Sequence, residues 1–378
     1  MSVVFWVSLS LLAYVYVVYP VLALLLALIV ERRVHAAPIT PSVSILIAAH
    51  NEETCLRATL ENKLQADYPA ERREIIVVSD GSKDGTDAIA REFAAEGVIL
   101  LRQDPRQGKT AALNLAARQA KGEILVFSDA NSLYAPGALR ALVSSFADPA
   151  VGYATGRLVY TQADAALCDQ GTSLYMRCED ILRVAETRLG SVVGVNGGID
   201  AARRSLYTPM RADQLPDFVL PLRVIEQGYR VIYNPAAVSF EPALLELTDE
   251  YRMRVRVSLR ALHALVDMTR LFNPWRFGLF SWQLLSHKLL RYTAFVPLLL
   301  FFLSSLLLAF HGATFAVALS CQVVGYLLAS FPFLGLRLRD AFPIRLAHYF
   351  TLLNAASAHA AYLWCRGEKR AVWKPRTG

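Results

Sequence analysis

Cysteine is scarce in this chain, and none of it has the spacing of a metal site. The 378 residues include five cysteines, an odd number, and no two of them form a CxxC pair. This pattern argues against a disulfide framework and against a structural zinc site. Internal repeats and low-complexity segments are also missing. No GxGxxG motif follows the first predicted strand, which disfavours a dinucleotide-binding domain.

Charge is missing from the beginning of the chain. Residues 3–30 contain no charged side chain, and this run exceeds the roughly 20 residues that cross a hydrocarbon core. It is too long for a removable signal peptide and lacks a basic start and a small-residue cleavage site. We therefore expect a transmembrane helix within residues 1–34. The basic sequence ERR at 31–33 predicts a cytoplasmic flank and an N-terminus that faces out.

Long apolar runs return after residue 290. Residues 291–310 and 313–334 predict two transmembrane helices joined by a tight turn, with basic groups at both cytoplasmic ends, namely His287, Lys288 and Arg291 before them and Arg337 and Arg339 after them. Residues 346–364 are less apolar, and the sequence leaves open whether they span or re-enter the membrane. The mixed aromatic and basic segment 273–290 predicts an interfacial amphipathic helix. Residues 291–378 thus form a membrane region with a basic tail.

The net charge of +7 does not require a nucleic-acid partner. The basic residues concentrate beside the apolar runs, where anionic lipid attracts them. We expect a multi-pass protein of the inner, cytoplasmic membrane whose soluble domain lies in the cytoplasm.

Residues 35–272 are of mixed polarity and predict one soluble domain. Apolar runs at 43–49, 74–80 and 123–129 have the length of strands that are buried on both faces. Segments with helical spacing separate them. This alternation predicts an α/β fold with a mostly parallel sheet and crossover helices.

Polar side chains follow three of these strands, at Asn51 and Glu52, at Asp80, and at Asp129 and Asn131. Asp and Asn are common in solvent-facing turns, so one such strand end would mean little. Ligands of parallel sheets gather beyond the carboxyl ends of the strands. Three polar strand ends therefore favour a binding site over three unrelated turns.

Six motifs occur in the order typical of membrane-bound family-2 glycosyltransferases. They read AAHNEE, VVSDGSKDGT, RQGKTAALN, FSDANS, GVNGGIDAARR and LPDFVLPLRV, and they span most of residues 42–241. Each motif is weak alone, whereas the ordered set is specific. The chain resembles this family, which implies a Rossmann-like GT-A fold and transfer of a sugar with inversion.

The resemblance implies a donor site for a nucleotide sugar. Asp80 would hold the nucleoside, with Glu52 and the backbone near Ala49 beside it, although the same segment could simply cap a helix. Lys109 would lie near the ribose or the diphosphate, in the first turn of a helix, where anions are favoured. A solvated lysine is the alternative.

Asp129 and Asn131 occupy the family's DxD position. A diphosphate is commonly neutralised by a divalent cation, and hard cations take oxygen ligands. Asn131 offers a carbonyl oxygen in place of the second carboxylate, so a site for Mg²⁺ or Mn²⁺ survives with one negative charge fewer.

Asp217 matches the aspartate that this family uses as its general base, and a carboxylate within about 3 Å of an acceptor hydroxyl can take its proton. Capping of the following helix is the alternative role. Gly197 and Gly198 would let the sugar approach the backbone closely.

The Q-x-x-R-W motif of processive members is not intact here. Met253 replaces the glutamine, Arg256 keeps the arginine, and Val257 replaces the tryptophan. Arg256 could bind the diphosphate, or it could belong to a basic face against lipid. The missing indole removes a surface on which an acceptor sugar could stack.

These features predict an inverting glycosyltransferase that moves a sugar, expected from a UDP-sugar, to a lipid-linked or polysaccharide acceptor at the membrane. A processive exopolysaccharide synthase that also translocates its product is the first alternative. A catalytically silent scaffold of an export complex is the second.

Overall fold

The computed structural model describes residues 1–161, 169–242, 247–334 and 341–369. The chain divides into two compact units. We call them the sheet unit, Val30–Thr161, Arg183–Ala243 and Lys369–Gly378, and the helical unit, Met1–Ile29, Gln162–Leu182 and Leu244–Glu368. Parts of the expected soluble domain 35–272 therefore group with the apolar helices.

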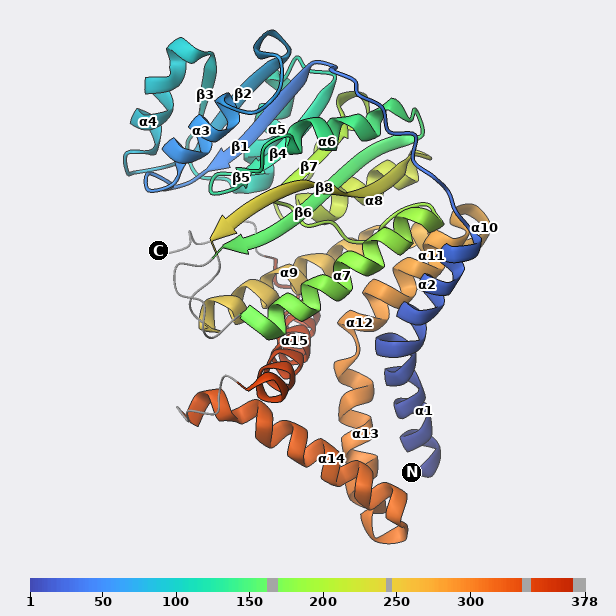
Figure 1. Cartoon of the computed structure of the whole chain (residues 1–378). Coiled ribbons are helices and arrows are strands. Elements are labelled where there is room, and N and C mark those ends of the chain that lie inside the picture. Colours follow the sequence, from blue (N-terminus) through green and yellow to red (C-terminus); the bar gives the residue numbers. More distant parts are fainter. Residues whose placement is uncertain (162–168, 243–246, 335–340, 370–378) are drawn as a thin grey trace. The chain divides into compact units, whose positions relative to one another are not determined.

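The sheet unit is built on an eight-stranded mixed sheet with the order β3-β2-β1-β4-β7-β6-β8-β5 (Figure 1). The strands are β1 Val43–Ala49, β2 Arg73–Asp80, β3 Val98–Gln103, β4 Ile124–Asp129, β5 Leu133–Tyr134, β6 Val151–Thr161, β7 Ile199–Arg203 and β8 Arg230–Pro242. Strands β1 to β4 pair in parallel. Strand β7 runs antiparallel to its neighbours β4 and β6. The fold is GT-A-like, as the sequence predicted.

The apolar runs form strands because both of their faces are covered. Every residue of β1 is buried, and the strand lies between β2 and β4. Ala48 pairs with Asp129, and Ala49 pairs with Ser79. The carboxyl ends of these three strands therefore meet at one edge of the sheet, which confirms the predicted convergence.

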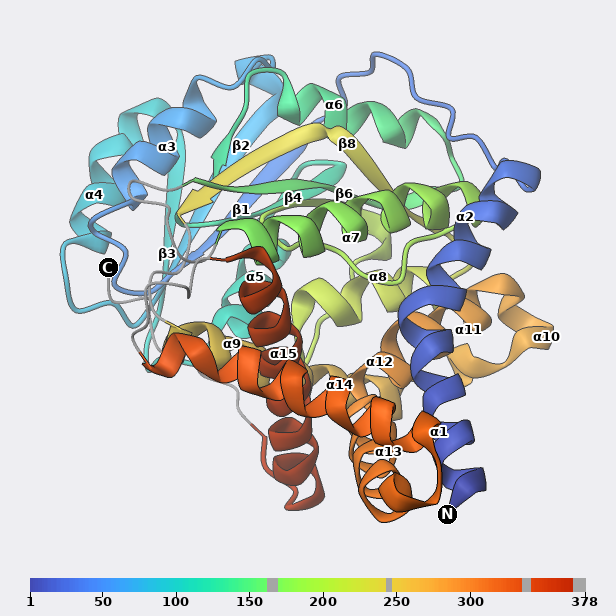
Figure 2. The same cartoon turned by 60° about the horizontal axis from the view of Figure 1, so that its bottom comes forward.

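Helices cover both faces of the sheet (Figure 2). Helices α3 Leu56–Leu64, α4 Thr86–Glu92 and α6 Ala138–Ser144 pack on one face, and α5 Lys109–Gln119 and α8 Pro216–Glu226 pack on the other. Short 3-10 turns lie at Ala70–Arg72, Phe93–Glu96, Ser145–Ala147 and Arg204–Leu206. The core of the first face joins alternate residues of β1, β2 and β4 to α3 and α6.

The helical unit contains the apolar segments. A continuous helical rod comprises α1 Ser2–Ala13, a π turn Tyr14–Val18 and α2 Tyr19–Ile29. The later elements are α9 Leu247–Asp267, a 3-10 turn Thr269–Phe272, α10 Pro274–Phe277, α11 Leu279–Gln283, a π turn Leu284–Leu289, α12 Leu290–Tyr292, α13 Phe295–Leu308, a 3-10 turn Ala309–His311, α14 Ala313–Ser330, a 3-10 turn Phe331–Leu334 and α15 Phe342–Cys365. Helix α7, Asp169–Leu189, begins in the helical unit and ends in the sheet unit.

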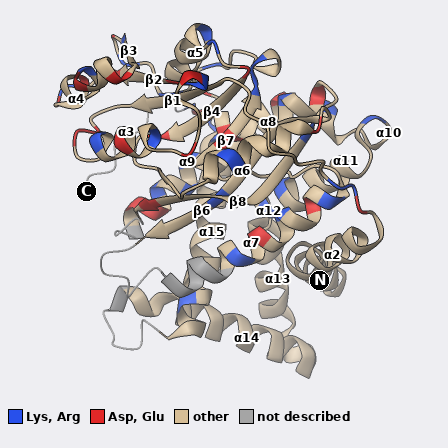
Figure 3. Cartoon of the chain, turned by 45° about the horizontal axis from the view of Figure 1, so that its top comes forward, with Lys and Arg blue, Asp and Glu red and all other residues tan. Residues whose placement is uncertain are grey.

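Among the described residues, Ser2–Ile29 and Ala313–Ser330 are long and apolar enough to cross a membrane. A third span exists if Leu279–Tyr292 and Phe295–His311, bent by 57°, count as one. Helices α13 and α14 carry no Lys, Arg, Asp or Glu, as their tan ribbons in Figure 3 illustrate. Arg337 and Arg339 lie outside the described residues, as does most of the basic tail.

The expected interfacial segment 273–290 comprises the short helix α10 and part of a longer helical run, Leu279–Tyr292, in which α11, the π turn and α12 follow one another without a break. The weaker apolar stretch forms the continuous helix α15, which packs on α9 through an apolar cluster of Val255, Leu259, Leu262, Ala356, Ala360 and Leu363. One face of α15 therefore meets protein.

Candidate active site

Lys109 joins two acidic side chains that the sequence placed in one site. Its Nζ lies 2.6 Å from Asp129 Oδ1 and 3.6 Å from Asp217 Oδ2. Lys109 is the first residue of α5, Asp129 ends β4, and Asp217 lies in the first turn of α8. Burial alone would lower the pKa of Lys109, but the two carboxylates outweigh burial and raise that pKa above its ordinary value.

Asp217 does not cap its helix. Helix α8 begins at Pro216, and its N-cap is Leu215, so Asp217 already lies within the first turn. An acidic group there is stabilised by the helix dipole. The side chain is 26% exposed, which leaves it open to a substrate.

At Gly197 and Gly198, the backbone lies close to acidic side chains. Gly197 has a φ of +86°, and a Cβ at this position would lie 2.8 Å from Asp217 Oδ2. A Cβ on Gly198 would lie 2.7 Å from Glu241 Oε1. At both glycines the backbone thus lies against the end of an acidic side chain, and a Cβ at either position would displace that carboxylate.

Asp80 is fully buried and bonded to the loop that precedes α5. Its Oδ1 accepts hydrogen bonds from Gln103 Nε2 at 2.6 Å and from the Gln107 amide at 2.8 Å. Its Oδ2 accepts from the Gly108 amide at 2.8 Å and lies 3.7 Å from Arg106 Nε. A carboxylate offers about four lone-pair sites, and three hydrogen bonds from the protein already use three of those of Asp80. Two of the three come from backbone amides of this loop, so the geometry supports a role of Asp80 in holding the loop. Direct contact between Asp80 and a nucleoside stays a prediction.

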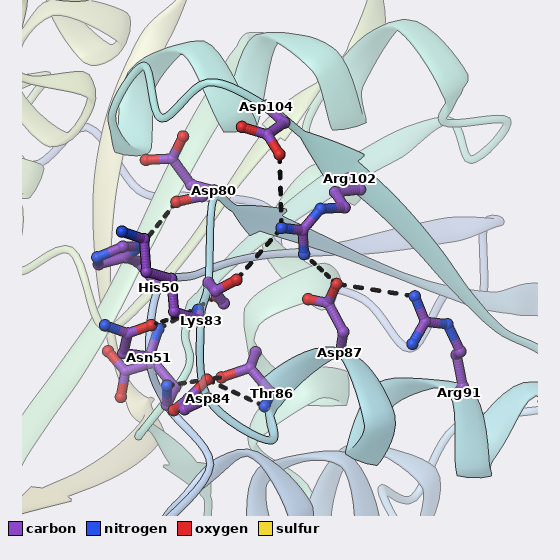
Figure 4. A network of polar contacts seen from close by, with 12 residues as sticks. His50, Asn51, Asp80, Lys83, Asp84, Thr86, Asp87, Arg91, Arg102 and Asp104 are labelled. Atoms are coloured by element: carbon purple, nitrogen blue, oxygen red, sulfur yellow. Dashed lines mark hydrogen bonds and ion pairs between the residues drawn. The ribbon is translucent and has the colours of Figure 1, made fainter.

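The loops that follow β1 and β2 are bonded to each other (Figure 4). The Asn51 amide donates to Ser82 Oγ, and Asn51 Oδ1 accepts from the Lys83 amide. The Glu52 amide donates to Thr86 Oγ1 at 2.8 Å. Ala49 is the last residue of β1 and is buried. The proposed nucleoside-binding residues Ala49 and Glu52 thus belong to a rigid edge of the sheet.

Asp129 and Asn131 supply the oxygen ligands that a hard cation prefers. Asp129 is partly exposed and Asn131 is half-buried. No group of three or more His, Cys, Asp or Glu side chains suited to a metal occurs in the described part of the chain. The donor set fits a divalent cation that shares its coordination with diphosphate oxygens and water.

Asp200 is an acidic residue of the site that sequence reasoning missed. It lies in β7, is fully buried, and its Oδ2 accepts a hydrogen bond from the Tyr153 hydroxyl at 3.0 Å. Its Oδ1 has no hydrogen-bond partner among the described residues. Burial raises the pKa of Asp200 to about 7, with a further contribution from Asp217, while hydrogen bonds from Thr155 and Tyr153 oppose the rise. The sequence did contain a signal for Asp200, namely an acidic residue within a short apolar strand.

Glu241 in β8 and Lys63 in α3 were also missed. Both side chains are buried, and nothing in the local pattern of α3 marks Lys63 as different from a surface lysine. Arg256 belongs to α9 of the helical unit, and its role in binding diphosphate stays a prediction.

Residues 44–207 match the family model for glycosyl transferase family 2. A probable glycosyltransferase, YdaM, of Bacillus subtilis is 30% identical over 215 residues, which are 53% of this chain and 50% of the relative. An N-acetylglucosaminyltransferase of Azorhizobium caulinodans is 27% identical over 54% of this chain and 55% of its own. A poly-beta-1,6-N-acetyl-D-glucosamine synthase of Staphylococcus aureus is 25% identical over 57% and 53%. The chain spans about half the length of these curated relatives.

One solved structure shares the fold of nearly the whole chain. It is the mannosyltransferase PcManGT from Pyrobaculum calidifontis in complex with GDP-Man and Mn²⁺. The alignment has a TM-score of 0.75 and 23% identity, and it covers 97% of this chain and 99% of that one.

Proposed function

The chain belongs to glycosyl transferase family 2, and from this premise we propose that it transfers a sugar, with inversion, from a nucleotide-diphosphate sugar to a lipid-linked or polysaccharide acceptor at the cytoplasmic face of the membrane. One observation carries the proposal. A single ammonium group, Lys109 Nζ, lies between Asp129 at the diphosphate side and Asp217 at the acceptor side.

Asp217 acts as the general base. It takes the proton of the acceptor hydroxyl while that oxygen attacks C1 of the donor sugar. The bond from C1 to the diphosphate breaks in the same step, so the nucleoside diphosphate leaves and the anomeric configuration inverts. Gly197 holds the backbone close to Asp217 and leaves room for the sugar.

Lys109 pairs with both carboxylates and offers positive charge to the diphosphate. Asp80 fixes the preceding loop through the amides of Gln107 and Gly108, and therefore fixes the start of α5. Asp129 and Asn131 would hold Mg²⁺ or Mn²⁺. When bound, the cation neutralises charge that develops on the leaving diphosphate.

A UDP-N-acetylhexosamine is the first donor to test, because two of the relatives are named for N-acetylglucosamine. GDP-mannose is the competing donor, since the aligned structure contains GDP-Man. We expect one of them to give nucleotide release from the purified full chain with Mn²⁺ or Mg²⁺. Failure of UDP-, GDP- and dTDP-sugars alike would contradict the proposal.

The same assay tests the base. Asp217→Asn should lower transfer by roughly 10²–10⁴-fold, the usual contribution of a general base. Asp213→Asn, four residues earlier and bonded to Arg211, is the matched control and should remain active. If Asp217→Asn is as active as the wild type, Asp217 is not the base, whereas a wild type without any transfer would favour the silent scaffold.

The processive synthase remains the second candidate, because one relative is named a polysaccharide synthase. Met253 and Val257, which replace two residues of the processive motif, favour single transfer. Mass spectrometry of the product distinguishes the two activities, since single transfer adds one residue and a synthase produces a ladder.

A further inference from the structure

The loop that carries the proposed metal ligands is held by one face of helix α3. Thr59 Oγ1 donates to the Ala130 carbonyl at 2.7 Å, and Lys63 Nζ donates to the Ser132 carbonyl at 2.6 Å. Two further hydrogen bonds join the Asn62 side chain to the backbone amide and carbonyl of Tyr134. Positions 59, 62 and 63 share a face because residues three and four apart are neighbours on a helix.

We call residues 129–134 the 129–134 loop. Along this loop, buried side chains alternate with side chains that are at least partly exposed. Ala130, Ser132 and Tyr134 are buried against α3, whereas residues 129, 131 and 133 are partly exposed or exposed. Residues 130 and 131 form a turn, in which the Ser132 amide donates to the Asp129 carbonyl at 3.2 Å. The contacts from α3 hold the backbone of this turn through the carbonyls of Ala130 and Ser132, while the side chains of Asp129 and Asn131 remain partly exposed.

Lysine is an unusual residue for holding a buried backbone carbonyl, as Lys63 holds that of Ser132. Its side chain is fully buried, and its Nζ also donates to Asn62 Oδ1 at 3.1 Å and lies 3.4 Å from the centroid of the Tyr134 ring. Burial lowers the pKa of Lys63 well below its ordinary value, and the charge of Glu241 opposes this. Burying a lysine is costly, and an apolar residue of similar length would fill the same space at lower cost.

Glu241 supplies the opposite charge from the other side of the loop. It is buried in β8 and accepts a hydrogen bond from the Ser132 hydroxyl. Ser132 is therefore held through its carbonyl by Lys63 and through its hydroxyl by Glu241. Glu241 also lies against Gly198, the neighbour of the glycine that contacts Asp217.

We propose that Lys63 and Glu241 act together as a buried charged brace that fixes Ser132 and so sets the separation of the Asp129 and Asn131 oxygens around the metal–diphosphate. Both are positioning residues, since neither touches the substrate. The inference rests on the proposed function, because it assumes that the 129–134 loop binds a metal nucleotide.

Binding of Mn²⁺ to the purified full chain in the presence of UDP, followed by electron paramagnetic resonance, is the test. Lys63→Met should weaken Mn²⁺ binding at least tenfold and raise the KM for Mn²⁺, with kcat at saturating Mn²⁺ changed much less. Lys121→Met, which removes an exposed lysine, should bind as the wild type does.

The double variant Lys63→Met/Glu241→Gln separates positioning from folding. Lys63→Met alone leaves a buried carboxylate without its cation, so its melting temperature should fall, and the double variant should recover that loss. Mn²⁺ binding should stay weak in the double variant, because nothing holds the Ser132 carbonyl. A folded double variant that binds Mn²⁺ as tightly as the wild type overturns the brace. A wild-type chain that binds no Mn²⁺ with UDP, GDP or dTDP instead overturns the proposed metal-nucleotide site.

Discussion

Asp200 is a buried acid whose protonation should change near neutral pH. Its carboxyl group is buried, one of its oxygens has no partner among the described residues, and burial, with a further contribution from Asp217, raises its pKa to about 7. An ordinary aspartate titrates near pH 4. The folded chain therefore holds a proton at Asp200 that the unfolded chain has already released at pH 6.

This difference gives the stability a definite pH dependence. A group whose pKa is raised in the folded state contributes stability that is present below its unfolded pKa and is lost as the pH rises through its folded pKa. Between pH 6 and pH 8, ionisation of Asp200 should lower the free energy of unfolding by roughly 1.4 kcal/mol.

Asp200→Asn should remove this contribution, because the amide does not ionise. Melting temperatures of wild type and variant in detergent, measured from pH 5.5 to 8.5, provide the check. We expect the difference in melting temperature to shift in favour of the variant as the pH rises. A constant difference across the range would mean that Asp200 is already ionised at pH 6.

At the scale of structural elements, the segment before β7 and the first turn of α8 approach each other so closely that only glycine fits between them. Gly197 and Gly228 have nearly the same backbone conformation, with φ of +86° and +87°. A Cβ on Gly197 would meet Asp217 Oδ2 at 2.8 Å, whereas a Cβ on Gly228 would meet nothing within 4 Å. The two positions thus share the backbone strain and differ in the contact.

Gly197→Ala and Gly228→Ala should therefore destabilise the chain similarly, by about 1–2 kcal/mol from the left-handed backbone alone. Only Gly197→Ala should lose sugar transfer, at least tenfold, because its methyl group displaces the carboxylate of Asp217. Parallel assays of melting temperature and nucleotide release test this pair. Equal activity of the two variants would show that Asp217 tolerates displacement and would weaken its assignment as base.

At the scale of the whole molecule, the charge pattern predicts an orientation. The basic flanks predict that the sheet unit lies in the cytoplasm and that the turn between α13 and α14 lies outside. Asp104, with a 69% exposed side chain, and Gly312, in that turn, are suitable labelling positions in a chain whose five cysteines are replaced by serine.

In intact cells, a membrane-impermeant maleimide should label Gly312→Cys and should not label Asp104→Cys. Permeabilised cells should give labelling at both positions. The reverse pattern in intact cells would invert the predicted topology, and labelling of both positions would contradict a membrane between them.

Several features were accessible from the sequence because they are local. Unbroken apolar runs specify buried strands and candidate spans, since hydropathy depends on the run itself. The acids at the ends of β2 and β4 converge because parallel strands present their carboxyl ends at one edge. The family motifs then assigned Lys109 and Asp217 to the same site, and the structure brings both side chains to Asp129.

Other features depended on contacts between distant segments. Lys63 and Glu241 are separated by most of the sheet unit in sequence, and their joint hold on Ser132 exists only once α3 and β8 pack around the same loop. Asp80 was predicted to hold the nucleoside, and only the structure shows that both of its oxygens accept hydrogen bonds from the loop before α5.

The sequence by itself determined which segments are apolar, which strands form, and which acids lie at their ends, because each of these properties resides in a few adjacent residues. Only the tertiary structure decided that α9 and part of α7 group with the apolar helices, that Asp200 is fully buried, and that a buried lysine and glutamate contact the 129–134 loop. The physical reason is that burial and charge pairing are set by what surrounds a side chain, and those surroundings come from distant parts of the chain.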